Sequence, residues 1–317
     1  MIVMKIRKWL TNNVSFGKKY LASSAERLEK SVRKETERLI EHQCAIYLWD
    51  KTLHCKESGV SDKRYCEEEI VVSLTSYGNR IHDVHLAIES IMQQTIKPNR
   101  IILWLAKDEF EGKTLPVALQ MQQERGLEIV YCDDMKSYKK LLPSLKRFPE
   151  TCIITIDDDL AYNPNVLEKL INCHKDNPTS ICAFRMHKVL LDDNGKPLPY
   201  TNWLHCIEEC PENNRLAFFT GGGGVLYPPH CFTDEVFNKD VFMDICGTAD
   251  DVWFNAMRLL NGVKVTKVFS SDSEGDFNEL SSSRVSPLRV DNVPFGNDKA
   301  IASVYGRYGL FEKLTNI

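Results

Sequence analysis

The sequence predicts an α/β protein built on a mainly parallel sheet with helices on both faces, preceded by an N-terminal helical extension. Three observations carry this expectation. Short apolar runs alternate with segments of helical period between about residues 69 and 190. Residues 1–66 are basic and helical in pattern, and residues 67–317 are expected to form the α/β domain. The 317 residues, 43% hydrophobic and 26% charged, exclude a disordered or fibrous chain and suffice for a large core.

The strands are expected where apolar runs are continuous, because strands of a parallel sheet are buried on both faces. These runs are 69–77, 100–106, 127–134, 151–160 and 180–191. Helical spacing appears between them, at 81–94, 113–126, 138–148 and 163–177, the last with Asn163 or Asn165 as cap. Ligands of such sheets bind beyond the carboxyl ends of the strands. The polar stretch 270–284 is expected to be a mobile loop.

The N-terminal extension has its own charge and apolar pattern. Residues 1–40 hold ten lysines or arginines against four glutamates, a net +6, so the rest of the chain carries −10 of the total −4. Two helices are expected, with apolar stripes at Ile2, Ile6, Trp9 and Leu10, and at Leu28, Val32, Leu39 and Ile46. A basic amphipathic start can lie on an anionic membrane surface, here the inner membrane. The equal alternative is that the helices pack on the body or on a partner subunit, as in a homodimer.

Charge and cysteine usage narrow the class of protein. A formal charge of −4 disfavours a general nucleic-acid binder. The eleven cysteines show no CxxC pair, which fits a reducing compartment and thiols that are buried as small apolar groups. Cys206 and Cys210, with His205 beside them, are a weak metal candidate. No apolar run is long enough to span a membrane and the start is no secretory signal, so a cytoplasmic location is expected.

Three adjacent acids follow a buried strand at Asp157, Asp158 and Asp159. Carboxylates this close repel one another unless a cation lies among them, and a divalent ion that carries a phosphate is the natural counter-ion. If the strand stays extended, Asp157 and Asp159 point the same way and Asp158 points away. The alternative is an Asx-rich turn that starts the next helix.

Two further segments strengthen the site interpretation. The run 218–229, FFTGGGGVLYPP, holds four glycines, and glycine lets a backbone approach a ligand closely. It is neither a P-loop nor a dinucleotide fingerprint. Asp250 and Asp251 lie at an expected helix start, where the backbone dipole should keep a carboxylate ionised, and Thr248 is the expected cap.

The order of IVVSLTSYGNR, IDDDL, GGGGVLYPP and TADDVWF resembles the bacterial GT-A type glycosyltransferases of the inverting family 2 kind, over about residues 69–310. The resemblance implies a Rossmann-like GT-A fold and a metal-dependent enzyme of the hexosyltransferase type. It would move a sugar from a nucleotide-diphosphate donor, with a UDP-sugar favoured, to a saccharide or lipid-linked acceptor. The setting it implies is capsule or lipopolysaccharide-type polysaccharide synthesis.

The resemblance also assigns roles to residues of this sequence. Asp157 and Asp159 would hold Mn²⁺ or Mg²⁺, with Asp159 the direct ligand, and Asp251 would be the catalytic base, with Asp250 beside it as competitor or acceptor ligand. The nucleotide and donor sugar would contact Thr75, Ser76, Tyr77, Arg80, Asp133 or Asp134, Lys140, Asp157, Asp158, Arg185, His187, Gly222 and Gly223.

The chain departs from the family in two respects. Asp250 stands where the family often has glutamate, and the Gln/Arg-rich motif and membrane spans of processive synthases are missing, which favours single or stepwise sugar addition. Two other functions stay open: a sugar-phosphate nucleotidyltransferase, or a non-catalytic sugar-nucleotide-binding subunit of a polysaccharide assembly complex.

Some residues have both a structural and a functional interpretation. His82 and His85 have metal-binding spacing but lack the HExxH glutamate, so packing or contact with the nucleotide loop is expected. Four aromatic residues could stack on an acceptor sugar or pack in the core: Trp203, Tyr227, Trp253 and Phe254.

Overall fold

The computed structural model describes residues 2–270, 276–280 and 296–315, in two compact units, Met1–Tyr47 and Leu48–Ile317. The helix α1 (Ile2–His54) makes up the whole of the first unit and the beginning of the second. The two helices predicted here are therefore one, since no proline interrupts residues 2–54. Leu28, Val32, Leu39 and Ile46 are exposed on it, at 57–68% of their surface. Among the described residues, no helix combines the length and the apolar character that a membrane crossing requires.

The second unit is built on a seven-stranded, mainly parallel sheet, as predicted. Its order is β10-β6-β9-β4-β1-β2-β3, and β9 alone among them runs antiparallel to its neighbours. The strands are β1 (Ile70–Thr75), β2 (Arg100–Ala106), β3 (Leu127–Cys132), β4 (Cys152–Thr155), β6 (Ile181–Ala183), β9 (Val225–Tyr227) and β10 (Val265–Lys267).

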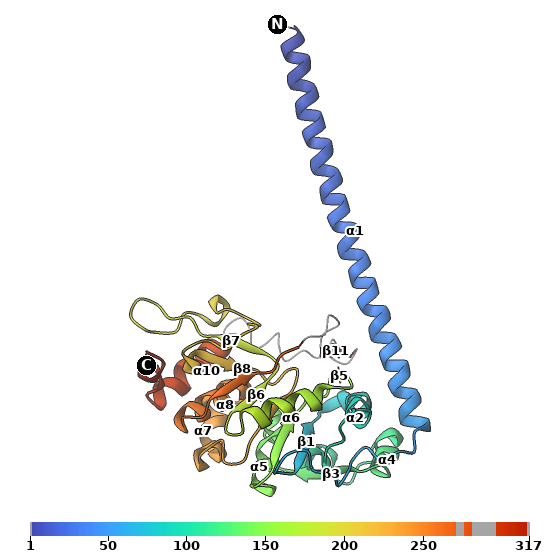
Figure 1. Ribbon diagram of the computed structural model, residues 1–317, viewed down its shortest axis with the longest axis vertical. Coiled ribbons are helices and arrows are strands. Elements are labelled where there is room, and N and C mark those ends of the chain that lie inside the picture. Colours follow the sequence, from blue (N-terminus) through green and yellow to red (C-terminus); the bar gives the residue numbers. More distant parts are fainter. Residues whose placement is uncertain (1, 271–275, 281–295, 316–317) are drawn as a thin grey trace. The chain divides into compact units, whose positions relative to one another are not determined.

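Helices cover both faces of the sheet and enclose two apolar cores (Figure 1). Side chains alternate along β1, so that Ile70 and Val72 enter one core and Val71 enters the other. The first core is closed by α2 (Val84–Met92), α4 (Val117–Gln123) and α6 (Val166–Asp176). The second is closed by α5 (Leu142–Arg147), α7 (Lys239–Cys246), α8 (Asp250–Leu260), α10 (Gly296–Arg307) and α11 (Leu310–Thr315). Short elements between them are η1 (Gly78–His82), α3 (Lys107–Phe110), η2 (Lys136–Lys140), η3 (Tyr200–Asn202), η4 (Asn214–Leu216) and η5 (Asp234–Phe237).

Two predicted strands are each divided. The run 151–160 becomes β4 and β5 (Leu160–Tyr162), and the run 180–191 becomes β6 and β7 (Met186–Lys188). β5 pairs with β11 (Phe277–Glu279) and β7 with β8 (Ala217–Phe219), both antiparallel and outside the main sheet. The predicted loop 270–284 thus contains a strand, while 271–275 and 281–284 lie outside the described residues. Both divisions place polar residues, at 157–159 and 185, at the edge of the main sheet.

Candidate active site

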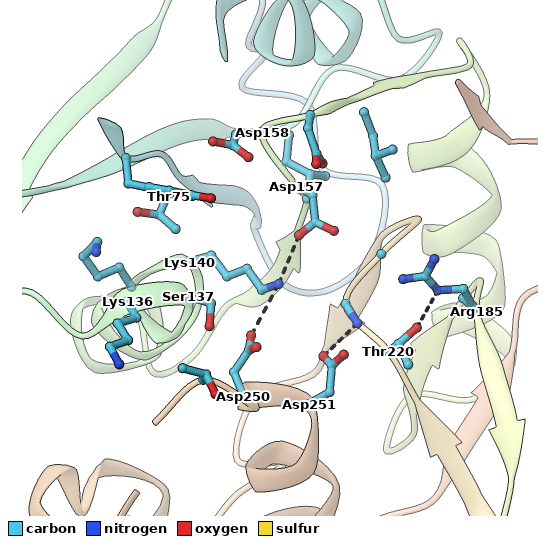
Figure 2. A pocket seen from close by; sticks show the side chains of 18 of the residues that line it. Thr75, Lys136, Ser137, Lys140, Asp157, Asp158, Arg185, Thr220, Asp250 and Asp251 are labelled. Carbon is cyan, nitrogen blue, oxygen red and sulfur yellow. Dashed lines mark hydrogen bonds and ion pairs between the residues drawn. The ribbon is translucent and has the colours of Figure 1, made fainter. Parts of the chain in front are cut away.

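A cavity of about 1030 Å³ opens at the carboxyl ends of the parallel strands. Its lining comes from the end of β1, the turn after β4, the glycine loop before β9 and the start of α8 (Figure 2). The glycine loop reaches this end because β9 runs antiparallel to β4, so its beginning lies beside the end of β4. The residues that follow the predicted strands therefore meet in one place, as expected for this class of sheet.

The acidic triplet forms a turn, because β4 ends at Thr155. Asp158 accepts hydrogen bonds from Ser76 Oγ at 2.6 Å and from Arg80 Nη1 at 2.7 Å. The same Arg80 nitrogen lies 3.0 Å from Asp159 Oδ2. The predicted alternation was wrong, since Asp158 and Asp159 share one cation. The turn interpretation describes the backbone correctly, yet all three acids line the cavity.

Lys140 connects the two acidic groups of the site (Figure 2). Its Nζ lies 3.0 Å from Asp157 Oδ1 and 3.4 Å from Asp250 Oδ2. Burial disfavours the charged ammonium, but the nearby carboxylates outweigh burial and raise the pKa of Lys140 well above its usual value. Burial likewise disfavours the charge of Asp157, but Lys140 holds the pKa of that carboxyl below its ordinary value. Lys140 is therefore a fixed positive charge between the two clusters.

Asp251 is the acid whose protonation is most sensitive near neutral pH. Burial, and then the charge of Asp250, raise the pKa of Asp251 to about 7, although Lys140 and a 2.9 Å hydrogen bond from the Gly221 amide oppose the shift. The expectation that the helix start keeps Asp251 ionised was wrong, because burial and the neighbouring acid outweigh the dipole. The helix cap is also not the predicted one, since Ala249 and not Thr248 occupies the N-cap.

The glycine loop is shaped by close contacts with cationic side chains. A Cβ on Gly222 would lie 2.1 Å from Arg185 Nη2, and one on Gly221 would lie 2.6 Å from Lys140 Nζ. Arg185 is oriented by a 2.6 Å hydrogen bond from its Nε to Thr220 Oγ1 (Figure 2). Gly222 lines the cavity as predicted, but Gly223 is not part of the described lining, because its φ of +94° directs it toward Phe277.

The structure places most of the other predicted residues at the cavity. Thr75 donates its hydroxyl to the Trp104 carbonyl at 2.8 Å, and Tyr77 lies against Arg80, whose guanidinium is 5.3 Å from the ring centre. Asp134 lines the cavity. Asp133 is exposed outside the described lining and forms an ion pair with Lys107.

His187 is a neutral polar group of the lining. Burial, and then the charges of His205 and Arg185, lower the pKa of His187 to about 4. Its Nδ1 accepts a 3.0 Å hydrogen bond from the Cys206 amide, which leaves the ring proton on Nε2 at neutral pH. Sequence reasoning missed His205, Thr220, Lys136 and Lys139 in this lining. Lys139 pairs with Asp134, and its position beside Lys140 was the available signal.

Several alternative site residues belong to the core. The four candidate stacking residues, Trp203, Tyr227, Trp253 and Phe254, are at most 4% exposed. His85 is fully buried, with its ring 4.2 Å from that of Trp49, so it packs rather than faces the nucleotide loop. Cys206 and Cys210 join no cluster of metal-binding side chains in the described part of the chain.

The charges of the site suit a divalent cation. Around its centre, five carboxylates of the described chain face three cationic side chains: Asp157, Asp158, Asp159, Asp250 and Asp251 against Arg80, Lys140 and Arg185. Burial, and then the charges of Asp157 and Asp158, raise the pKa of Asp159 to about 6, so the cluster is short of positive charge. Carboxylate oxygens are the ligands that Mn²⁺ and Mg²⁺ prefer. The residues present therefore fit such an ion.

No protein-family model matches the sequence, and no curated protein matches it. Three solved structures resemble the fold. A mannosyltransferase, PcManGT from Pyrobaculum calidifontis, solved with GDP-Man and Mn²⁺, is 10% identical, with 89% of this chain and 86% of that chain covered and a TM-score of 0.44. A CMP:2-keto-3-deoxy-manno-octonic acid synthetase with CTP is 12% identical (67% and 92% covered, TM-score 0.38). HddC from Yersinia pseudotuberculosis is 10% identical (52% and 78% covered, TM-score 0.34). Such low similarity transfers neither a substrate nor a reaction to this chain.

Proposed function

We propose that the chain is a metal-dependent inverting glycosyltransferase that moves a sugar from a nucleotide-diphosphate donor to a saccharide or lipid-linked acceptor. One observation carries the proposal: two acidic groups, from the end of β4 and the start of α8, converge on Lys140 in one cavity. An inverting transfer needs one acidic group for the metal and another for the acceptor proton. The family 2 assignment, a UDP-sugar donor and a role in capsule or lipopolysaccharide synthesis rest on the sequence resemblance.

At the donor end, Asp157 and Asp159 would hold Mn²⁺ or Mg²⁺, which as a Lewis acid stabilises the leaving diphosphate. Arg185 lies across the same part of the cavity, where its guanidinium can pair with phosphate oxygens. The bare backbone of Gly222 leaves room for that guanidinium, because any side chain there would collide with it. These residues position and neutralise the donor.

At the acceptor end, Asp251 takes the proton of the attacking hydroxyl. A general base works best when its pKa lies near the working pH, and that of Asp251 is about 7. The backbone amide of Gly221 holds one of its oxygens at 2.9 Å and so fixes the direction of the other. Asp250 is tied to Lys140 and is left to orient the acceptor or the lysine.

The test measures release of nucleoside diphosphate from a panel of nucleotide sugars, with Mn²⁺, with Mg²⁺ and with chelator. Metal-dependent release is expected, and Asp157→Asn should weaken donor affinity in the presence of metal by at least about tenfold. Asp133→Asn is the matched control, because Asp133 is an exposed acid outside the described lining.

Other outcomes would identify the other functions. Pyrophosphate release from a nucleoside triphosphate and a sugar phosphate would show a nucleotidyltransferase. Tight donor binding without turnover of any acceptor, unchanged by Asp251→Asn, would show a non-catalytic binding subunit.

A further inference from the structure

Four potential metal ligands gather at the end of the sheet opposite to the cavity. Cys66 and Glu68 precede β1, Cys152 begins β4 and His174 lies in the last turn of α6. The ligand atoms of this thiol–imidazole cluster (Cys66, Glu68, Cys152 and His174) all lie within 4.8 Å of one another. β4 runs from Cys152 toward Asp157, five residues on, so the cluster is about 16 Å from the acidic turn. It is a separate site.

The distances within the cluster match those around a tetrahedral ion. His174 Nε2 lies 3.3 Å from Cys152 Sγ and 3.2 Å from Glu68 Oε2. Zinc bonds of about 2.0–2.3 Å place tetrahedral ligand atoms roughly 3.3–3.8 Å apart. Two thiols, an imidazole and a carboxylate are all ligands that zinc accepts, and thiolates are ligands that Mg²⁺ and Mn²⁺ avoid.

Hydrogen bonding does not explain the same contacts fully. A neutral ring nitrogen carries either one hydrogen or one lone pair, so His174 Nε2 cannot both donate to Glu68 and accept from the Cys152 thiol. A protonated ring would need a buried cation, and His174 is 1% exposed. A metal ion bound to all three groups removes this conflict, because each ligand then directs a lone pair at one centre.

We propose that Cys66, Glu68, Cys152 and His174 form a structural zinc site. The ion would join the segment before β1 to the start of β4 and to α6. β1 and β4 are paired from Ile70 and Cys152 onward, and at their far ends they carry Ser76 and the acidic turn. The site therefore fixes the two strands that present much of the cavity, without contributing a group to it.

The first test is the metal content of the full chain, purified with reduced thiols and without added metal. Stoichiometric zinc is expected by mass spectrometry, and the Co²⁺-substituted protein should show thiolate charge-transfer absorption and the intense visible bands of a tetrahedral site. Removing zinc with a strong chelator should lower the melting temperature by roughly 5–15 °C, and added zinc should restore it.

Variants locate the ion. Cys66→Ser should lose the zinc and the cobalt spectrum, and because Cys66 is only partly buried this variant should fold. Cys173→Ser is the matched control, a partly buried thiol of α6 beside His174, and should keep both. Asp157→Asn should also keep both, even if it abolishes donor binding, so the zinc site and the proposed transferase activity fail independently. A metal-free wild type that takes up neither zinc nor cobalt, a Cys66–Cys152 disulfide in the native protein, or zinc retained by Cys66→Ser would each overturn the proposal.

Discussion

Replacing Asp251 by asparagine tests the proposed base through its unusual pKa. Asn keeps the size of the side chain and its contact with the Gly221 amide but cannot take a proton. General-base catalysis contributes typically about 10²–10⁴-fold. Turnover of Asp251→Asn should fall by a factor of that order while donor affinity stays near that of the wild type.

The pH dependence follows from the pKa of about 7 for Asp251. A group with that pKa is ionised by about half at pH 7, by roughly 9% at pH 6 and by roughly 1% at pH 5. Because only the ionised form accepts a proton, kcat/KM of the wild type should fall about tenfold for each pH unit below 6 and level off above pH 8. The residual activity of the variant should lose this limb.

Stability gives a second measure of the same pKa that does not depend on catalysis. A carboxyl whose pKa is higher in the folded than in the unfolded state binds its proton more tightly when folded, so stability falls as the pH rises from about 4 to 7. Asp251→Asn removes this loss and should be more stable than the wild type at pH 8, by about 1–4 kcal/mol, with little difference at pH 4. A flat pH–rate profile in the wild type, or equal stability at pH 8, would refute the reasoning.

Three other perturbations probe the lysine, a buried ion pair and the N-terminal unit. Gly221→Ala places a methyl group 2.6 Å from the Lys140 ammonium, so turnover should fall by about 10²-fold while the melting temperature changes little; unchanged turnover would mean that the lysine position is unimportant. Glu89→Gln removes the charge that Arg125 contacts at 2.8 and 3.0 Å inside the protein, and urea denaturation should show a loss of about 3–5 kcal/mol, whereas a loss below about 1 kcal/mol would contradict a buried pair. A chain that begins at Leu48 should keep its donor affinity and lose liposome binding or self-association; no change in either would show that the helix serves neither purpose.

The sheet was predictable because its signals are local. The run of 70–75 is apolar on both faces, which indicates a strand buried between two layers of helices, and the structure confirms it. The division of 180–191 into β6 and β7 was not predictable, because Arg185 interrupts no apolar pattern strongly enough and its contact with Thr220 is formed by a distant segment. The start of the second unit at Leu48 likewise depends on tertiary contacts, such as that of Trp49 with His85.

The candidate site was predictable as a set of residue types and not as an arrangement. Adjacent acids after a buried strand indicate a need for positive charge, and the sequence contains that signal at 157–159. Which cation meets each acid depends on the turn, and sequence periodicity assigned Asp157 and Asp158 to opposite sides for the wrong reason. The pKa of Asp251 shows the same limit, since the helix start is visible in the sequence but burial is not.

The charge balance of the cavity links the proposed donor to the proposed ion. Among its described lining residues, eight carboxylates outnumber five lysine and arginine side chains, so a diphosphate entering without a cation meets net repulsion. Lys140 cannot relieve this by turning to the phosphates, because doing so would leave Asp157 and Asp250 buried without their partner. Arg185, held through Nε by Thr220, keeps its terminal nitrogens at the glycine loop and can meet a phosphate. Donor and divalent ion should therefore bind with positive coupling, each reducing the electrostatic cost of the other.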